Sequence, residues 1–418
     1  MTKLIISFHL ILVFILAYFN DKTEKNTSTS NITICHSIVE DFAENTPDDS
    51  TKAYSMPLLA QTPKGEVMLS WTEKDAKGMT LFCLAFSKDK GKTFADKKII
   101  FSGNGIANSR MMRAKVLAKK DGSLIAVFLK SDAPQGGRGG GRSANIVYCV
   151  SKDAGSTWTA PISVDADPKQ GIMRGFFNAV VMSNDEIAVV YLKDVENSAK
   201  HEERNLRLVI TKNGAFLPER IIDPVVCDCC PINMLIDADG ALNVVYRDNN
   251  DDIRDMAKMT STDNAVTFSK SQILHDDKWK INGCPHSGAV SSTFGKSALF
   301  AWFSGTEKET GIRLVTKEGK QLFVLSDASA KNPYLIDSKT SSLMLWEQNT
   351  GENNVSKIAY RKITNGKVSE TIWLDGSSNA TNLVALSIEV EQHNQALVAY
   401  EVKQANNRNT IKISTINL

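Results

Sequence analysis

The chain has 418 residues, of which 42% are hydrophobic, and this is enough apolar material for a large core. Its 49 Lys and Arg residues nearly balance its 47 Asp and Glu residues, so the formal net charge is only +2. This balance gives no electrostatic basis for binding nucleic acid or an anionic membrane surface.

The N-terminal segment 1–19 has the pattern of a signal peptide or membrane anchor. Lys3 precedes the apolar stretch 4–19, and the polar segment 20–30 follows it as a linker. The stretch is shorter than the roughly 20 residues of a membrane span, which favours a signal peptide, with an uncleaved anchor as the alternative. We therefore expect residues 31–418 to lie outside the cytoplasm, in the periplasm, at the cell surface or secreted. Any contact with a membrane would run only through the N-terminal segment.

A short apolar run that ends in an aromatic residue recurs along the rest of the chain. The closing residues are Trp71, Phe128, Tyr191, Tyr246, Trp302, Trp346 and Tyr400, spaced 44 to 63 residues apart. Short turns such as 63–65 and 120–122 join the runs within each repeat, which leaves no room for crossover helices and predicts antiparallel meanders. We expect an all-β, seven-bladed β-propeller of four-stranded meanders. Six blades plus an appendage is the alternative, because one spacing is short.

The last repeat supplies only three strands before the chain ends at Leu418. A missing fourth strand would leave an open sheet edge. The strand-like segment 31–39 precedes the first repeat, so we predict that it pairs with the last repeat and closes the ring.

The turns after the third runs share the motif S-x-D-x-G-x-T-[W/F]. Segments 87–94 and 151–158 fit it in full, and segment 261–268 lacks the Gly. These turns resemble the Asp-boxes, or BNR repeats, of the sialidase (neuraminidase) superfamily. In such a turn we expect the Asp to accept backbone N–H groups, the Gly to take a positive φ, and the aromatic residue to pack between sheets. The resemblance implies a sialidase-like propeller from about residue 50 onward, with the boxes on the face opposite the active site.

One sialidase feature is missing. The resemblance implies an Arg-Ile-Pro segment at the start of the first blade, whose Arg grips the substrate carboxylate. Here the aligned segment 54–57 keeps Pro57 but has Ser55 in place of that Arg. The resemblance therefore does not extend to the arginine that exo-sialidase activity uses, and glycosidase activity stays an open question.

A ligand site is expected where the first strands begin and the second strands end, because both gather at one mouth of the propeller channel. X-Pro steps align there at 56–57, 230–231, 284–285 and 332–333. The candidate residues for holding an acidic sugar are Arg113, Arg174, Arg247 and Arg254. The alternative for Arg113 and Arg174 is an ion pair between blades. Asp248 or Asp228 would serve as acid or base and Tyr246 as a nucleophile, and a lyase mechanism using Tyr246 and His286 is the other option.

The fourth and fifth repeats open with clustered cysteines, in Cys227-Asp228-Cys229-Cys230 and Cys284-Pro285-His286. We expect four thiols and an imidazole to converge near the channel mouth. Three interpretations stay open: one or two disulfides, a zinc or copper site, or free redox-active thiols. Cys83 and Cys149 lie inside apolar runs and are predicted to be packing residues. No other cofactor is expected.

These observations together predict an exported, sialidase-like propeller that binds, and in one interpretation cleaves, an acidic glycan at the channel mouth. The partner would be an acidic oligosaccharide and not nucleic acid. The alternatives are a non-catalytic glycan-binding or scaffold propeller and a Cys/His metal-binding propeller.

Overall fold

The computed structural model describes residues 35–37, 52–131, 144–169, 171–198, 204–294, 297–338, 341–404 and 408–418. The predicted leader 1–19 and the linker 20–30 lie outside these ranges. Among the described residues, no helix is long and apolar enough to cross a membrane.

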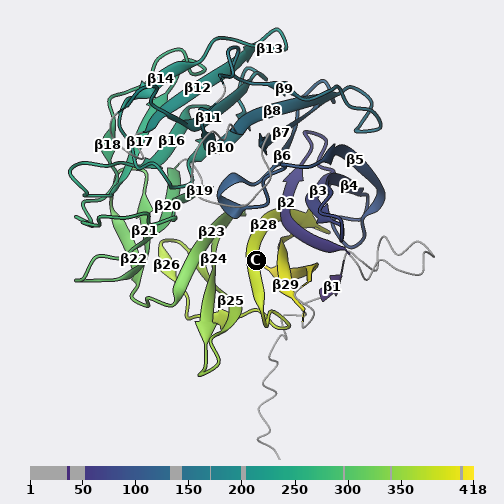
Figure 1. Cartoon of the computed structure of the whole chain (residues 1–418). Coiled ribbons are helices and arrows are strands. Elements are labelled where there is room, and N and C mark those ends of the chain that lie inside the picture. Colours follow the sequence, from purple (N-terminus) through teal and green to yellow (C-terminus); the bar gives the residue numbers. More distant parts are fainter. Residues whose placement is uncertain are drawn as a thin grey trace, which may run out of the picture. The chain divides into compact units, whose positions relative to one another are not determined.

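The described strands form seven antiparallel sheets, and each sheet corresponds to one sequence repeat (Figure 1). Blade 1 consists of β2 (Ala53–Gln61), β3 (Val67–Lys74), β4 (Thr80–Ser87) and β5 (Ala95–Gly103). Blade 2 follows the short 3-10 turn η2 (Arg110–Met112) and consists of β6 (Lys115–Ala118), β7 (Leu124–Ser131), β8 (Ala144–Ser151) and β9 (Ile162–Ser163). Blade 3 consists of β10 (Arg174–Val181), β11 (Ile187–Asp194), β12 (Arg204–Lys212), β13 (Ala215–Phe216) and β14 (Arg220–Asp223).

The second half of the chain repeats this pattern. Blade 4 consists of β15 (Asn233–Ile236), β16 (Leu242–Arg247), β17 (Met256–Ser261) and β18 (Gln272–Ile273). Blade 5 consists of β19 (Val290–Phe294), β20 (Ser297–Ser304), β21 (Gly311–Thr316) and β22 (Gln321–Leu325). Blade 6 consists of β23 (Ala330–Asp337), β24 (Ser342–Thr350), β25 (Val355–Thr364), β26 (Lys367–Val368) and β27 (Ile372–Trp373). Blade 7 consists of β28 (Ala380–Val390), β29 (His393–Lys403), β30 (Asn409–Asn417) and β1 (Cys35–Ser37).

Strand β1 supplies the outer strand of the last blade. It pairs antiparallel with β30, with Cys35 opposite Ser414, although the two strands lie at opposite ends of the chain. The predicted ring closure is therefore confirmed. The seven-bladed prediction is confirmed as well, and the six-bladed alternative is wrong.

The closing aromatic residues form the core between neighbouring blades, as predicted. Each is no more than 1% exposed. Trp71, for example, packs among side chains of blades 1 and 7, in one cluster with Tyr54 and Val384. Buried indole N–H groups need acceptors, and Trp302 finds one in Asp277, whose Oδ2 lies 2.8 Å from its Nε1. The repeat thus records the interface between blades and does not provide a sugar-stacking surface.

The three S-x-D turns have the geometry that the motif predicts. The Oδ1 atoms of Asp89, Asp153 and Asp263 each accept the backbone N–H four residues later at 2.9 Å. Gly155 has a φ of 82°, and Ala265 adopts the same left-handed region at 64° where the third copy lacks Gly. The turns connect third strands to fourth strands, so they lie at the end of the blades opposite the start of the inner strands.

Several inner strands carry a β-bulge at the same place. In blades 1, 3, 6 and 7 the pairing between the inner strand and the second strand shifts register after the first two or three residues of the inner strand. The residues with positive φ at these bulges are Met56, Phe176, Asn332 and Asn382. A bulge bends its strand and redirects the neighbouring side chains. The bulges therefore decide which residues face the propeller axis.

Candidate functional site

The inner strands of all seven blades surround one cavity of about 240 Å³. In each blade the residue that pairs with the position before the closing aromatic lines this cavity. These residues are Leu58, Lys115, Asn178, Asn233, Val290, Tyr334 and Val384. The cavity is thus a property of the blade register, and it lies on the channel axis as expected.

The cavity wall has somewhat more apolar than polar surface, and among its described residues the positively charged groups outnumber the negatively charged ones. Arg110, Arg113 and Lys115 line it together with a single carboxylate, that of Glu347. Amide side chains complete the wall at Asn178, Asn233, Asn332 and Asn382, and His286 lies at its edge. Such side chains donate hydrogen bonds to hydroxyl groups and anions.

Arg113 reaches the cavity, as predicted from its place before the second closing aromatic. Its Nη1 donates to the carbonyl oxygen of Pro57 at 2.7 Å, and its Nη2 donates to that of Asn382 at 3.2 Å. The guanidinium therefore links the bulges of blades 1 and 7 to blade 2. Beside it, burial and the charge of Arg113 lower the pKa of Lys115 to about 8, so the half-buried amine still carries a proton at neutral pH.

Glu347 is held by donors on three blades. Its Oε2 accepts from Nδ2 of Asn332 at 2.7 Å and from Nη1 of Arg110 at 3.2 Å. Its Oε1 accepts from the backbone N–H of Leu383 at 3.3 Å. Both carboxylate oxygens thus accept hydrogen bonds.

In blades 6 and 7 the side chain directly after the closing aromatic bonds to the inner strand of the next blade. Glu401 holds this place in blade 7 and accepts the backbone N–H of Met56, at the blade 1 bulge, at 2.7 Å. Burial raises the pKa of Glu401, although hydrogen bonds from Met56, Asn382 and Asn409 oppose the shift. We call such a side chain, placed directly after a closing aromatic and hydrogen-bonded to the backbone of the next blade, a latch residue.

Arg247 is the latch residue of blade 4 and does not reach the cavity. Its Nε and Nη2 both donate to the carbonyl oxygen of Ser287 at 3.0 Å, and its Nη2 also donates to that of Phe303 at 3.1 Å. The guanidinium lies over the Trp279 ring, 4.8 Å from its centroid. The side chain is 1% exposed. It therefore does not line the cavity, because its guanidinium donates to the carbonyl oxygen of Arg254 within blade 4 and to those of Ser287 and Phe303 in blade 5.

Arg174 is likewise absent from the described residues that line the cavity. It is fully buried, and its Nε donates to Oδ2 of Asp165 at 2.7 Å. Lys193 shares that carboxylate at 3.0 Å. The residue begins β10, two positions before the bulge at Phe176, so its side chain faces blade 2 instead of the axis. The ion-pair alternative describes this residue.

The predicted acid, base and nucleophile also lie away from the cavity wall. Tyr246 is 1% exposed, and its hydroxyl donates to Asp223 at 2.5 Å. Burial, followed by the hydrogen bond to Asp223, raises the pKa of Tyr246. Burial also raises the pKa of Asp248, whose oxygens accept from Asn249 and Asn250. No described contact joins these groups to a common reaction centre.

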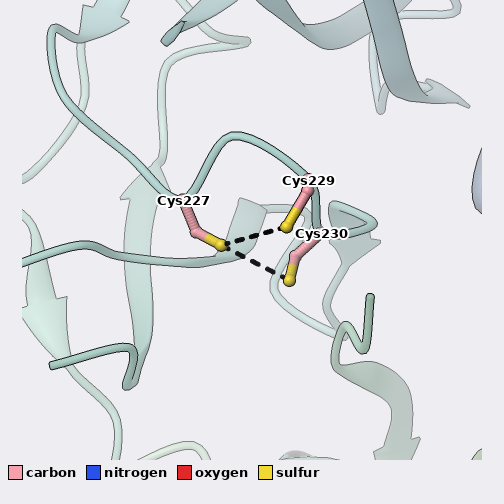
Figure 2. Close-up of side chains that lie close together, drawn as sticks. All are labelled: Cys227, Cys229 and Cys230. Carbon is pink, nitrogen blue, oxygen red and sulfur yellow. Dashed lines mark hydrogen bonds between the residues drawn. The ribbon is translucent and has the colours of Figure 1, made fainter. Parts of the chain in front are cut away.

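The cysteines of blades 4 and 5 do come together. The Sγ atom of Cys227 lies 3.8 Å from that of Cys229 and 3.5 Å from that of Cys230, and Figure 2 shows the three sulfurs turned toward one another. The ligand atoms of Cys229, Cys284 and His286 form a second group, all within 4.8 Å of one another. We call these five side chains the thiol cluster. The predicted convergence is confirmed, and His286 connects the cluster to the cavity.

Two charged residues predicted as functional border this cluster. Arg254 donates from Nη1 to the Sγ of Cys227 at 3.2 Å and pairs with Oδ1 of Asp228 at 3.4 Å. Hydrogen bonds from Cys229 and Cys230, together with Arg254, lower the pKa of Cys227, whereas burial opposes this shift.

All six cysteines whose side chains are described have free thiols, so no disulfide joins them. The disulfide interpretation of the cluster is thus wrong for the described residues. Cys83 and Cys149 are buried in separate core clusters, as predicted. Burial raises the pKa of Cys149 to about 11.

The predicted equivalence of Cys230 and Cys284 is also wrong. By strand register Cys230 corresponds to Ser287, three residues after Cys284. The inner strand of blade 5 begins only at Val290, so the preceding segment is irregular and brings Cys284 to the cluster by a different route.

The fold is shared with a solved sialidase structure. A structure described as the Hadza microbial sialidase Hz136 superposes with a TM-score of 0.50 and 13% sequence identity, over 88% of this chain and 66% of the sialidase chain. An α-L-arabinanase of Penicillium chrysogenum in complex with arabinobiose matches with a TM-score of 0.42 and 16% identity, over 88% of this chain and 94% of that chain. No protein-family profile and no curated protein sequence matches the chain. The likeness to the sialidase confirms the predicted fold at the level of architecture.

Sequence reasoning missed several residues of the cavity wall, among them Lys115, Tyr334, Asn178 and Asn233. The sequence does carry a signal that could have identified some of these residues. In the first four repeats the cavity residue lies 13 positions before the closing aromatic, as Lys115 does before Phe128. The later repeats have hairpins of other lengths, so the spacing of 13 residues does not hold in them.

Proposed function

We propose that this protein binds the end of an anionic saccharide in the axial cavity, outside the cytoplasm, as its signal-like N-terminal segment predicts. The observation that carries the proposal is the cavity wall, where Arg110, Arg113 and Lys115 face one carboxylate, that of Glu347. A sialidase of the same fold supports a carbohydrate as the class of ligand.

The size of the cavity narrows the ligand. Its volume of about 240 Å³ is below the roughly 300–1,000 Å³ of sites for drug-sized molecules. It therefore suits one terminal sugar residue better than the middle of a chain. The ring of asparagines would bind the hydroxyl groups, and the cations would bind a carboxylate or sulfate group.

Binding fits the wall better than hydrolysis does. Glycoside hydrolysis commonly needs two carboxyl groups, or a Tyr nucleophile with a base. The described wall offers Glu347 alone among carboxylates, and both of its oxygens already accept hydrogen bonds. Tyr334 faces the same cavity, but burial raises its pKa, which opposes its use as a nucleophile.

Calorimetric titration with matched acidic and neutral oligosaccharides tests the proposal. We expect Lys115→Gln to weaken binding of the acidic member about 10-fold or more, because a hydrogen bond from a charged group contributes about 1.5–3 kcal/mol. The control is Lys212→Gln, an exposed lysine at the end of β12 on the opposite side of the blades, which should bind like the unaltered protein.

Equal binding of neutral and acidic sugars, or an unchanged affinity in Lys115→Gln, would contradict the proposal. Product release is followed in the same samples. Turnover that disappears in Glu347→Gln would show that the cavity is catalytic and that binding alone is the wrong description.

A further inference from the structure

The thiol cluster has the spacing of a metal site. A tetrahedral zinc ion with Zn–S bonds of about 2.3 Å places its sulfur ligands about 3.8 Å apart. The two distances from the sulfur of Cys227, 3.8 Å to Cys229 and 3.5 Å to Cys230, are close to this value. The three cysteines are no more than 4% exposed, so their sulfurs are shielded from competing ligands.

The loop that carries these sulfurs is held before any ligand binds. The backbone N–H of Cys227 donates to the carbonyl oxygen of Arg247 at 3.0 Å, and Val226 forms a β-bridge with Asp248. Arg204 of the neighbouring blade donates to the carbonyl oxygen of Asp228. A site with its ligands already positioned loses little entropy on binding.

The charge around the cluster favours thiolates. Arg254 is 7% exposed and donates to the sulfur of Cys227, while its buried Nε has no hydrogen-bond partner. The guanidinium also pairs with the carboxylates of Asp228 and Asp252, which offset the cost of its burial and hold it beside the sulfurs. Three thiolates around a metal cation leave excess negative charge, which the guanidinium would offset.

Cys229 belongs to two groups of ligands at once. It faces Cys227 and Cys230 on one side, and Cys284 with His286 on the other. The second pair comes from the segment before blade 5, and His286 also lines the axial cavity. An ion at Cys229 would thus take ligands from two blades.

We propose that the thiol cluster binds one thiophilic metal ion, Zn²⁺ or Cu⁺, through Cys227, Cys229 and Cys230, with Cys284 or His286 completing the site. Soft thiolate ligands select both of these ions, and four ligands suit zinc, whereas three suffice for Cu⁺. The site is separate from the cavity wall cations, so it does not depend on the saccharide proposal.

The test is metal binding by the full chain, reduced and handled without oxygen. The protein is stripped with a chelator and titrated with Zn²⁺ or with Cu⁺ against a colorimetric chelator, and the retained metal is measured by elemental analysis. We expect about one equivalent per chain and protection of three thiols from alkylation. Cys229→Ser should weaken binding about 100-fold or more, since this residue belongs to both groups and even outer contacts are commonly worth 10–100-fold.

The matched control is Cys149→Ser, which removes a buried thiol from the core of blades 1 and 2 and should leave metal binding unchanged. Because a buried variant can fail to fold, the double variant Cys284→Ser, His286→Ala is measured as well, with circular dichroism on every sample. Its ligands lie on a partly exposed loop, and we expect weaker zinc binding in a folded protein. Stripped wild-type protein that binds no more metal than Cys229→Ser, or a Cys227–Cys230 disulfide in protein never exposed to oxygen, would overturn the proposal.

Discussion

The latch position is used in opposite ways in two regions of the ring. In blades 6 and 7 it holds Glu347 and Glu401, whose carboxylates accept backbone N–H groups from the next blade. In blade 4 it holds Arg247, which donates to the carbonyl oxygen of Ser287 in blade 5. In these three blades the position links neighbouring blades, and the sign of the charge matches the backbone group, N–H or carbonyl, that the next blade presents.

The difference begins in the inner strands. The long strands β2 and β28 are bulged, and the bulge leaves a backbone N–H, such as that of Met56, free to meet a carboxylate. Strand β19 starts late, at Val290, and the irregular segment before it presents a carbonyl oxygen. The same irregular segment carries Cys284 and His286. The arginine latch and two of the five side chains of the thiol cluster thus both depend on the segment before β19.

Replacing Arg247, the arginine latch, should have the largest effect on stability among the variants that test this comparison. Arg247→Met would leave three buried carbonyl oxygens, those of Ser287, Arg254 and Phe303, without their donor. We expect a loss of about 3 kcal/mol in the free energy of unfolding, measured with urea, because unpaired buried polar groups cost about 1–3 kcal/mol each and partly find water. Arg110→Met is the control, since this half-exposed side chain makes a surface ion pair worth about 0–1 kcal/mol. Equal losses in the two variants would show that Arg247 is no latch.

The sequence predicted the ring because the ring is built from local patterns. Each closing aromatic, from Trp71 to Tyr400, must be buried between blades, and that requirement shows as a period in the chain. The closing strand β1 was also predictable, because an open sheet edge demands a partner. Arg113 was found for the same reason, since its hairpin is regular.

The site was predicted less well because it depends on irregular backbone. A bulge at Phe176 shifts Arg174 off the axis, and nothing in the sequence marks that bulge. Cys284 lies six residues before β19 begins, whereas Cys230 lies three residues before β15 begins, so the expected equivalence of the two cysteines failed. The partner of Arg174, Asp165, lies only nine residues away, but its role appears only once the connection to β10 folds back.

The carboxylate latch gives a smaller and pH-dependent effect. In Glu401→Gln the new side chain still has an oxygen that can accept the backbone N–H of Met56. Its NH₂ group, however, would face the NH₂ donor of Asn409, which now donates to the carboxyl group. We therefore expect a loss of about 1 kcal/mol in the free energy of unfolding at acidic pH. Burial raises the pKa of Glu401 above its ordinary value of 4.5, so the folded chain holds this proton more tightly than the unfolded chain does. The stability contributed by this group is therefore largest below pH 4.5 and falls as the pH rises through the raised pKa.

Urea unfolding of the wild type and Glu401→Gln across this range measures the difference. The advantage of the wild type should shrink as the pH rises. An advantage that grows with pH would mean that the hydrogen bonds from Met56, Asn382 and Asn409 outweigh burial, and that the folded pKa is lowered.

The smallest expected effect is that of Ala265→Gly in the S-x-D turn of blade 4, and its counterpart is Gly155→Ala in the turn of blade 2. Gly155 and Ala265 occupy the same left-handed turn position, with φ of 82° and 64°. Gly155→Ala should cost about 1–2 kcal/mol, because the left-handed region is strained for L-residues and the new Cβ would lie 3.3 Å from Leu84. Ala265→Gly relieves the same strain but increases the freedom of the unfolded chain, so we expect a gain of only about 0.5 kcal/mol. Thermal unfolding of both variants tests this reciprocity. A loss in Ala265→Gly would show that the packing of the Ala265 methyl group between blades 3 and 4 outweighs the backbone strain, and that this turn has adapted to its missing glycine.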